Sequence, residues 1–200
     1  MSGPMTSPRF SRYLVIDFEA TCCDRGTVPR HQMEIIEIGA VMVDATDFHI
    51  EDEFQSFMRP VRHPVLTDFC TSLTSIAQQD VDAAPSFNRF VSAFKPWLDG
   101  YDDFAFCSWG DYDYRQLHQD CEFHGIPCPI TATHLNVKRL FSERSATRKK
   151  IGLAEAIRKV GLDFTGTQHR GIDDARNIAR LLPFVFAESC PTASVTGRRS

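Results

Sequence analysis

Two acidic residues at the end of a short apolar segment are the first candidates for chemistry in this sequence. Asp17 ends the run Tyr13–Asp17, whose strand-forming apolar residues indicate a buried strand, and Glu19 follows it. Because side chains of a strand alternate between its faces, the two carboxylates point the same way, with Cα atoms roughly 6.5 Å apart. Two neighbouring carboxylates repel each other and lose hydration when buried, and a cation that both can bind removes this energetic cost. Hard oxygen ligands favour Mg²⁺ or Mn²⁺ over zinc. The alternative interpretation is a pair of exposed acids at a strand end.

A third acidic candidate follows another predicted strand. Asp111 comes after the apolar segment Phe104–Cys107. In open α/β sheets, active sites form at strand ends and in the loops that leave them. The alternative for Asp111 is the N-cap of the next helix, a position that aspartate fills well. Both roles are compatible if the neighbouring Asp113 takes the capping task.

The segment His169–Asn177 combines a histidine, a glycine and two acids at a predicted helix start. Acids suit a helix N-terminus because of the helix dipole. Of Asp173 and Asp174, one is expected to face inward and the other to face solvent. His169 lies five residues before Asp174 and is a candidate general base for a water molecule near a metal. The alternative for His169 is a packing or surface histidine.

Strand and helix signals alternate along the chain in a way that predicts a single α/β domain. Three early strands suggest an antiparallel meander, and the later elements suggest crossovers, which together suit a ribonuclease H-like mixed β-sheet flanked by α-helices. The expected strands are Tyr13–Asp17, Ile35–Val43, Phe54–Met58 and Phe104–Cys107, and the expected helices are Thr67–Gln79, Phe87–Leu98, Tyr112–His124, His134–Phe141, Leu153–Val160 and Asp173–Phe186.

Composition restricts the class of protein. The 200 residues carry a net charge of −4, which argues against a broad basic DNA-binding face. No apolar run approaches the roughly 18 residues of a membrane span, and no secretory signal is visible, so a cytoplasmic location with reduced cysteines is expected. We expect a flexible leader at 1–10, the catalytic domain at 11–188 and a flexible tail at 189–200.

Two further clusters have a possible function. The basic segment Lys138–Lys150 is either a solvated face or a grip for phosphates beyond a cleft. Cys121, His124 and Cys128 are metal-ligand types, but they lack a paired C-x-x-C and a fourth ligand. Buried thiols beside a surface histidine are therefore the favoured interpretation of this second cluster.

Five segments together resemble the DEDDh exonucleases of the DnaQ-like superfamily. Within that superfamily they are most similar to the group of the 3′ histone mRNA exonuclease, the RNA-interference-enhancing exonucleases and related bacterial enzymes. The resemblance extends from about Tyr13 to Phe186, and its first and last segments are the most diagnostic. The segments are Asp17–Cys22, Glu34–Gly39, Leu73–Ile76, Trp109–Asp113 and His169–Ala179.

The resemblance implies a metal-dependent 3′–5′ exonuclease that converts single-stranded nucleic acid, RNA above all, to nucleoside 5′-monophosphates. It implies two Mg²⁺ ions, replaceable by Mn²⁺, and a two-metal mechanism. The implied metal ligands are Asp17, Glu19, Asp111 and Asp174. The implied catalytic residues are His169, as general base, and Glu19. The residues implied at the terminal nucleotide are Glu19, Ala20, Tyr112 and His169, with Leu73 and Ile76 as an apolar wall for its base.

Two other functions are compatible with the sequence. One is a non-catalytic module that binds nucleic-acid ends, although clustered acids have little use in a pure binder. The other is an oligoribonuclease restricted to very short oligonucleotides. The chain has no room for the accessory nucleic-acid-binding domain of some relatives, so preferences that depend on that domain are not transferred. No residue pattern marks a dimer face, and no single residue decides between RNA and DNA.

Overall fold

The computed structural model describes residues 10–145 and 151–187. The expected leader lies outside the described residues except for Phe10, and the expected tail lies wholly outside them. Arg148, Lys149 and Lys150 of the basic segment also lie outside them. In the part of the chain that is described, no helix is both long and apolar enough to cross a membrane.

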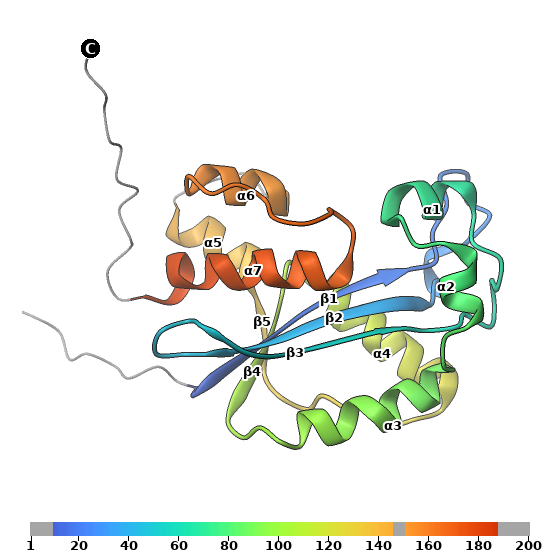
Figure 1. Ribbon diagram of the computed structural model, residues 1–200, viewed down its shortest axis with the longest axis horizontal. Helices are drawn as coiled ribbons and strands as arrows, with labels where there is room; N and C mark the ends of the chain where they lie inside the picture. The colour runs from blue at the N-terminus through green and yellow to red at the C-terminus, as the bar shows by residue number, and fades with distance from the viewer. Residues whose placement is uncertain (1–9, 146–150, 188–200) are drawn as a thin grey trace, which may run out of the picture.

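A mixed sheet forms the centre of the molecule (Figure 1). Its strands, among the described residues, are β1 (Arg12–Ala20), β2 (Ile35–Asp44), β3 (Ile50–Phe57), β4 (Phe104–Ser108) and β5 (His134–Asn136). Their order across the sheet is β3-β2-β1-β4-β5. The β1–β2 and β2–β3 pairs are antiparallel, and the β1–β4 and β4–β5 pairs are parallel. The expected meander followed by crossovers is thereby confirmed.

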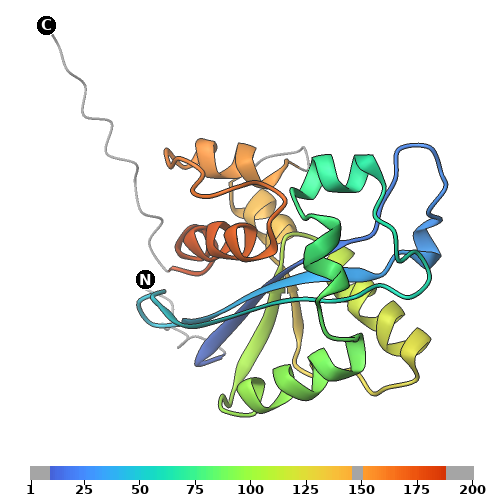
Figure 2. The ribbon, with the colours of Figure 1, turned by 45° about the vertical axis from the view of Figure 1, so that its right-hand side comes forward.

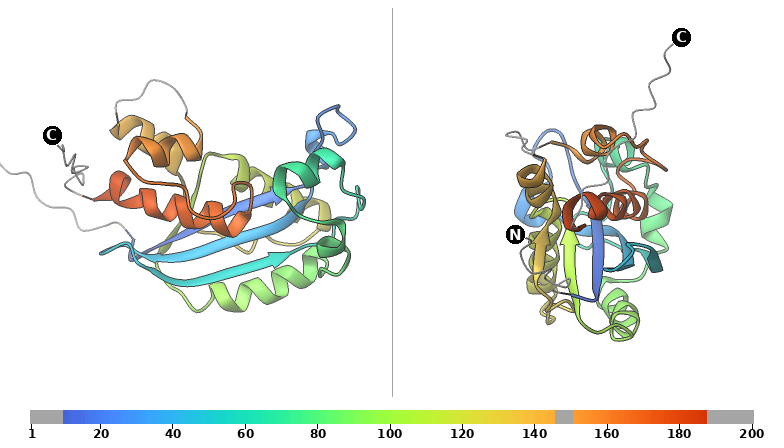
Figure 3. Two further views of the ribbon diagram at one scale, coloured as in Figure 1. Left: turned by 45° about the horizontal axis from the view of Figure 1, so that its top comes forward. Right: turned by 90° about the vertical axis from the view of Figure 1, so that its left-hand side faces the viewer.

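Helices cover both faces of this sheet, as Figure 3 shows. The side chains of α5, α6 and α7 pack in one core, and those of α3 and α4 pack in the other. The expected mixed sheet flanked by helices is therefore confirmed. The helices are α1 (Asp68–Thr74), α2 (Gln78–Asp82), α3 (Phe87–Leu98), α4 (Tyr112–His124), α5 (Val137–Arg144), α6 (Leu153–Lys159) and α7 (Gly171–Phe186).

Strand β1 is central because it is apolar on both faces. Tyr13 and Val15 point into the core under α7, whereas Leu14 and Ile16 point into the core over α3. This double burial fixes the register of β1, since a shift by one residue would exchange the two faces. The acidic end of β1 is positioned by the same register.

The helix expected over Thr67–Gln79 is two short helices instead. Thr67 caps α1 by accepting a hydrogen bond from the Cys70 amide, and Ser75 ends it in the left-handed conformation at φ 59°. The Asp80 carboxylate then accepts the Ala77 amide at 2.9 Å and starts α2. Figure 2 shows α1 at the same end of the sheet as the connection between β1 and β2.

The helix expected from His134 begins three residues later. His134–Asn136 form β5, which pairs in parallel with Phe106–Ser108. The Asn136 side chain then accepts the Arg139 amide at 2.9 Å and caps α5. A tertiary pairing therefore overrides the local helix signal at these three residues.

Candidate active site

Asp17 and Glu19 lie side by side at the end of β1, as their spacing predicts. In the antiparallel pairing with β2, Asp17 is opposite Gly39 and Glu19 is opposite Glu37, and the register shifts directly after Glu19. Burial raises the pKa of Asp17 well above its usual range, and the charges of Asp113 and Glu19 raise it further. Burial, followed by the Asp174 and Glu37 charges, raises the pKa of Glu19 to about 9.

The acid that joins this pair from α4 is Asp113, and the expectation for Asp111 is corrected. Asp113 lies in the first turn of α4, is 4% exposed, and accepts the Phe18 amide at 2.9 Å. Burial raises the pKa of Asp113 to about 6, against the opposing effect of the Phe18 amide. Asp111 is exposed and accepts a hydrogen bond from Asn136 Nδ2 at 2.8 Å.

The start of α4 explains this exchange of roles. Gly110, at φ 123°, turns the chain so that Asp111 occupies the N-cap position outside the helix. Asp113 instead shares the inward face of α4, which faces the sheet. A signal for this was present in the sequence, because the buried positions follow helical spacing from the first turn onward. They are Asp113, Gln116, Leu117, Asp120 and Cys121.

Helix α7 supplies the fourth acid, Asp174. Asp174 is 8% exposed and accepts the His169 amide at 3.0 Å. Burial raises the pKa of Asp174 to about 7. Asp173 turns away from it, accepting the Thr167 amide at 2.8 Å and pairing with Arg176 at 3.3 Å. The expected division between an inward and an outward aspartate is confirmed.

Two glycines allow the start of α7 to touch the sheet. A Cβ added to Gly39 on β2 would lie 2.0 Å from the Gly171 carbonyl carbon, and one on Gly171 would lie 3.0 Å from the Asp17 carbonyl oxygen. Only backbones without side chains approach this closely. The contact therefore places the first turn of α7, with Asp174, directly over the acidic end of β1.

His169 lies two residues before α7, in a strained backbone conformation. It is exposed and adopts φ 61°, an uncommon conformation for a residue with a side chain. One ring nitrogen of His169 and one carboxylate oxygen each of Glu19 and Asp174 lie within 4.8 Å of one another. The predicted histidine is thus brought to the predicted acids.

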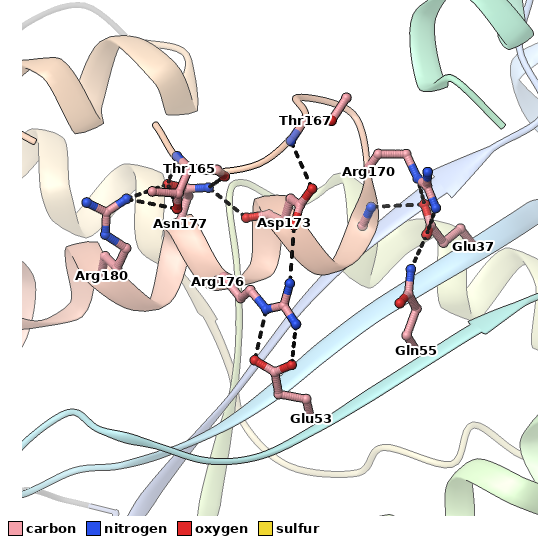
Figure 4. A network of polar contacts seen from close by, with 11 residues as sticks. Glu37, Glu53, Gln55, Thr165, Thr167, Arg170, Asp173, Arg176, Asn177 and Arg180 are labelled. Atoms are coloured by element: carbon pink, nitrogen blue, oxygen red, sulfur yellow. Dashed lines mark hydrogen bonds and ion pairs between the residues drawn. The ribbon is translucent and has the colours of Figure 1, made fainter. Parts of the chain in front are cut away.

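A buried glutamate on β2 holds Arg170, the residue that follows His169 in the sequence (Figure 4). Glu37 is fully buried and accepts hydrogen bonds from Arg170 Nε at 3.2 Å and Nη2 at 3.1 Å. It also accepts the Gly171 amide at 3.0 Å and Gln55 Nε2 at 2.7 Å. Each of the two carboxylate oxygens of Glu37 therefore accepts two hydrogen bonds, so this carboxylate is satisfied without a cation. No role was predicted for Glu37 from the sequence, where its partner Arg170 lies 133 residues away.

One cavity of about 340 Å³ collects these groups. Of the predicted nucleotide contacts, Ala20, Tyr112 and Leu73 line it. Ile76 does not, because it is fully buried in a small core with Cys70 and Val81, so its predicted place is corrected. The complete lining is Asp17, Phe18, Glu19, Ala20, Cys22, Met33, Leu73, Trp109, Tyr112, Asp113, Leu153, His169 and Asp174.

The chemistry of this donor set fits divalent cations. Four carboxyls converge in the cavity, and burial and mutual repulsion favour their protonated forms. A bound Mg²⁺ or Mn²⁺ reverses that preference because it stabilises the ionised carboxylates. A larger hollow of about 610 Å³ beside α3 contains no comparable convergence of acids, so the chemistry belongs to the smaller cavity.

The second candidate metal cluster is not assembled. Cys121 is buried and its thiol contacts that of Cys128. The His124 ring stacks on Phe87 with centroids 4.9 Å apart, so this histidine is partly buried and not on the surface as expected. Among the described residues, the trio does not bring three ligand atoms together.

Comparison with known proteins places these features in a family. The model of the Exonuclease family (RNase_T) matches residues 14–182. The chain is 34% identical over 192 residues to ERI1 exoribonuclease 3 of Bos taurus, covering 91% of this chain and 56% of the relative. It is 31% identical to 3′-5′ exoribonuclease 1 of Homo sapiens, covering 88% of this chain and 52% of the relative. The chain thus spans about half the length of these relatives.

Solved structures agree with this grouping. The nuclease domain of 3′hExo, described as a DEDDh family member bound to rAMP, superposes with a TM-score of 0.81 at 30% identity. That match covers 94% of this chain and 98% of the other. Escherichia coli Exonuclease I in complex with a dA16 oligonucleotide shares the fold alone, with a TM-score of 0.69 at 12% identity.

Proposed function

Because the chain belongs to the Exonuclease family, in its DEDDh group with a ribonuclease H-like fold, we propose that it is a metal-dependent 3′–5′ exonuclease. Its substrate is single-stranded nucleic acid, chiefly RNA, and its products are nucleoside 5′-monophosphates. The observation that carries the proposal is the cavity in which four acids and one histidine lie together. These residues are Asp17, Glu19, Asp113, Asp174 and His169.

The four acids of the cavity would hold two Mg²⁺ ions, with Mn²⁺ as a substitute. Carboxylate oxygens are the ligands that both ions prefer. In this proposal Asp113 takes the place expected for Asp111. When bound, the ions supply Lewis-acid stabilisation of the charge on the attacking and leaving oxygens.

The remaining residues act on water and on the terminal nucleotide. His169 accepts the proton of the attacking water, supported by its position beside Glu19 and Asp174. The water oxygen bonds to phosphorus, the bond from phosphorus to the 3′-oxygen breaks, and the strand keeps a new 3′-hydroxyl. Ala20 and Tyr112 would contact the terminal nucleotide, with Leu73 as the apolar wall for its base.

RNA is the favoured substrate for two reasons. The curated relatives in the comparison are described as exoribonucleases. The superposed nuclease domain is described as bound to rAMP, a ribonucleotide.

We place the catalytic domain at residues 11–188. We also propose a cytoplasmic location, supported by the free thiol state of the six cysteines within the described residues.

The decisive experiment uses 5′-labelled single-stranded RNA and, separately, DNA, each with Mg²⁺, with Mn²⁺ and with EDTA. We expect a metal-dependent ladder that shortens from the 3′ end, faster on RNA. Binding without cleavage under every condition would overturn the proposal in favour of a non-catalytic module. Cleavage confined to oligomers of two to five nucleotides would identify an oligoribonuclease.

A further inference from the structure

An arginine from the connection between β1 and β2 stands beside the acidic cavity. Arg30 begins a short 3-10 helix (Arg30–Gln32), and its guanidinium carbon lies 4.5 Å from the centroid of the Tyr112 ring. Its Nη1 donates a hydrogen bond to Gln116 Oε1 at 2.6 Å. Because Tyr112 lines the cavity, the ring of Tyr112 connects the Arg30 guanidinium to the edge of the acidic cavity.

The support of Arg30 is rigid. Gln116 is fully buried on α4, and its Nε2 donates to the Met33 carbonyl at 2.9 Å and to Asp120 Oδ1 at 3.1 Å. A side chain that is fixed by its own hydrogen bonds holds its partner at little further cost in entropy. The stack on Tyr112 fixes the plane of the guanidinium as well.

Among the described residues, the charge of Arg30 has no acidic partner, in contrast to a second arginine in a similar stack. Arg62 lies 3.8 Å from the Phe123 ring, but it pairs with Glu34 at 3.8 Å and with Asp120 at 3.5 Å. For Arg30, no carboxylate within the described ranges forms an ion pair. Arg30 is exposed, and an arginine has five N–H donors, of which one is used here.

We propose that Arg30 binds a backbone phosphate of the nucleic-acid strand outside the acidic cavity. The inference rests on the proposed function. A guanidinium fork matches phosphate oxygens, and a positive charge at the edge of the cavity offsets the repulsion between its acids and the strand. When a strand with a 3′-hydroxyl has its scissile phosphate at the acids, every other phosphate is upstream. Arg30 therefore binds an upstream phosphate and favours longer strands.

The test replaces Arg30 by glutamine and measures hydrolysis of a ten-nucleotide RNA. We expect Arg30→Gln to raise KM about tenfold, the loss of one charged hydrogen bond, with kcat within about twofold. The slope of log KM against log salt concentration should fall by about 0.7, the value for one phosphate of a single strand. Arg25→Gln is the matched control, because Arg25 lies in the same connection, has an 86% exposed side chain, and pairs with its sequence neighbour Asp24.

Two further measurements locate the effect. Thymidine 5′-p-nitrophenyl phosphate contains the scissile phosphate and no upstream phosphate. The loss of kcat/KM that Arg30→Gln causes on this substrate should therefore be at least about fivefold smaller than the loss on the ten-nucleotide RNA. Equal losses on both substrates, wild-type KM and salt slope, or the same loss in Arg25→Gln would each overturn the proposal.

Fluorescence anisotropy of the labelled strand in EDTA separates this inference from the proposed function. Without any turnover in the wild type, weaker binding by Arg30→Gln alone would still support a phosphate site at Arg30.

Discussion

Asp111 and Asp113 differ by two positions and offer a direct test of the site at the scale of single residues. Asp113→Asn keeps the shape of the side chain but removes a charge from the cavity, where Asp113 is 4% exposed. We expect kcat on single-stranded RNA to fall by about a hundredfold or more, since one stabilising group at a reacting phosphate contributes about that much. Rates at saturating Mg²⁺ measure this effect.

The control is Asp111→Asn, which changes an exposed residue whose contact is Asn136. Its rate should stay within about threefold of the wild type, as expected for a surface position. The reverse order of the two losses would return the metal-ligand role to Asp111.

The residues of this site could be predicted to different degrees. Strand alternation alone predicts that Asp17 and Glu19 point the same way, whereas the choice of Asp174 over Asp173, and of His169 as a site residue, came from the resemblance of the last segment. Between Asp111 and Asp113 the resemblance favoured Asp111, although the start of α4 at Tyr112 was predicted correctly. Which of the two faces the sheet depends on the turn at Gly110, whose φ of 123° is a property of the folded chain. The helical spacing of Asp113 with Gln116 and Leu117 was the usable signal.

At the scale of elements, two glutamate–arginine pairs join α7 and its N-cap residue Arg170 to the sheet (Figure 4), and Arg170 directly follows His169 in the sequence. Glu37 on β2 holds Arg170 and the Gly171 amide, whereas Glu53 on β3 holds Arg176, six residues farther along the chain. We expect Glu37→Gln to lower kcat by about ten- to a hundredfold through displacement of His169, with Mn²⁺ affinity and KM within about threefold. Steady-state kinetics and calorimetric Mn²⁺ titration measure these quantities.

Glu53→Gln is the matched control, since it weakens an equivalent pair on the same helix at a more exposed place. Its kcat should stay within about twofold of the wild type. If both variants lose activity in proportion to their loss of folded protein by circular dichroism, Glu37 is a structural residue only and does not position His169.

Element boundaries show where prediction from sequence ends. Helices α3 and α4 could be predicted over their full lengths because their buried residues follow helical spacing and a glycine lies at or just beyond each C-terminal end. Strand β5 could not, because its three residues are ordered by pairing with β4 and carry no alternation of their own. The same holds for the contact of Gly39 with Gly171, which depends on two segments far apart in the sequence.

At the scale of the whole molecule, the function of the cavity opposes the stability of the fold. The sheet and α7 bring four carboxyls together, and burial raises the pKa values of Asp113, Asp174 and Glu19 to about 6, 7 and 9. In the unfolded chain such groups titrate near 4. Between these values the folded protein binds more protons than the unfolded chain, so its free energy of unfolding falls as pH rises. A divalent cation should offset this loss because it replaces the protons.

We therefore expect the thermal midpoint of unfolding in EDTA to decrease as the pH is raised from about 5 to about 9. Over the same pH range, the increase in the thermal midpoint that Mg²⁺ causes should become larger. At a hundredfold excess of Mg²⁺ over Kd near pH 8.5, binding contributes about 2.7 kcal/mol, or roughly 5–10 °C for a chain of this size.

Asp120, whose pKa burial raises to about 7, lies outside the cavity and contributes to the decrease of the thermal midpoint in EDTA. The difference between Mg²⁺ and EDTA isolates the cavity, since Asp120 is common to both conditions. An equal Mg²⁺ effect at pH 5.5 and pH 8.5 would contradict proton-linked metal binding by these acids, and in Asp113→Asn the difference should shrink at every pH.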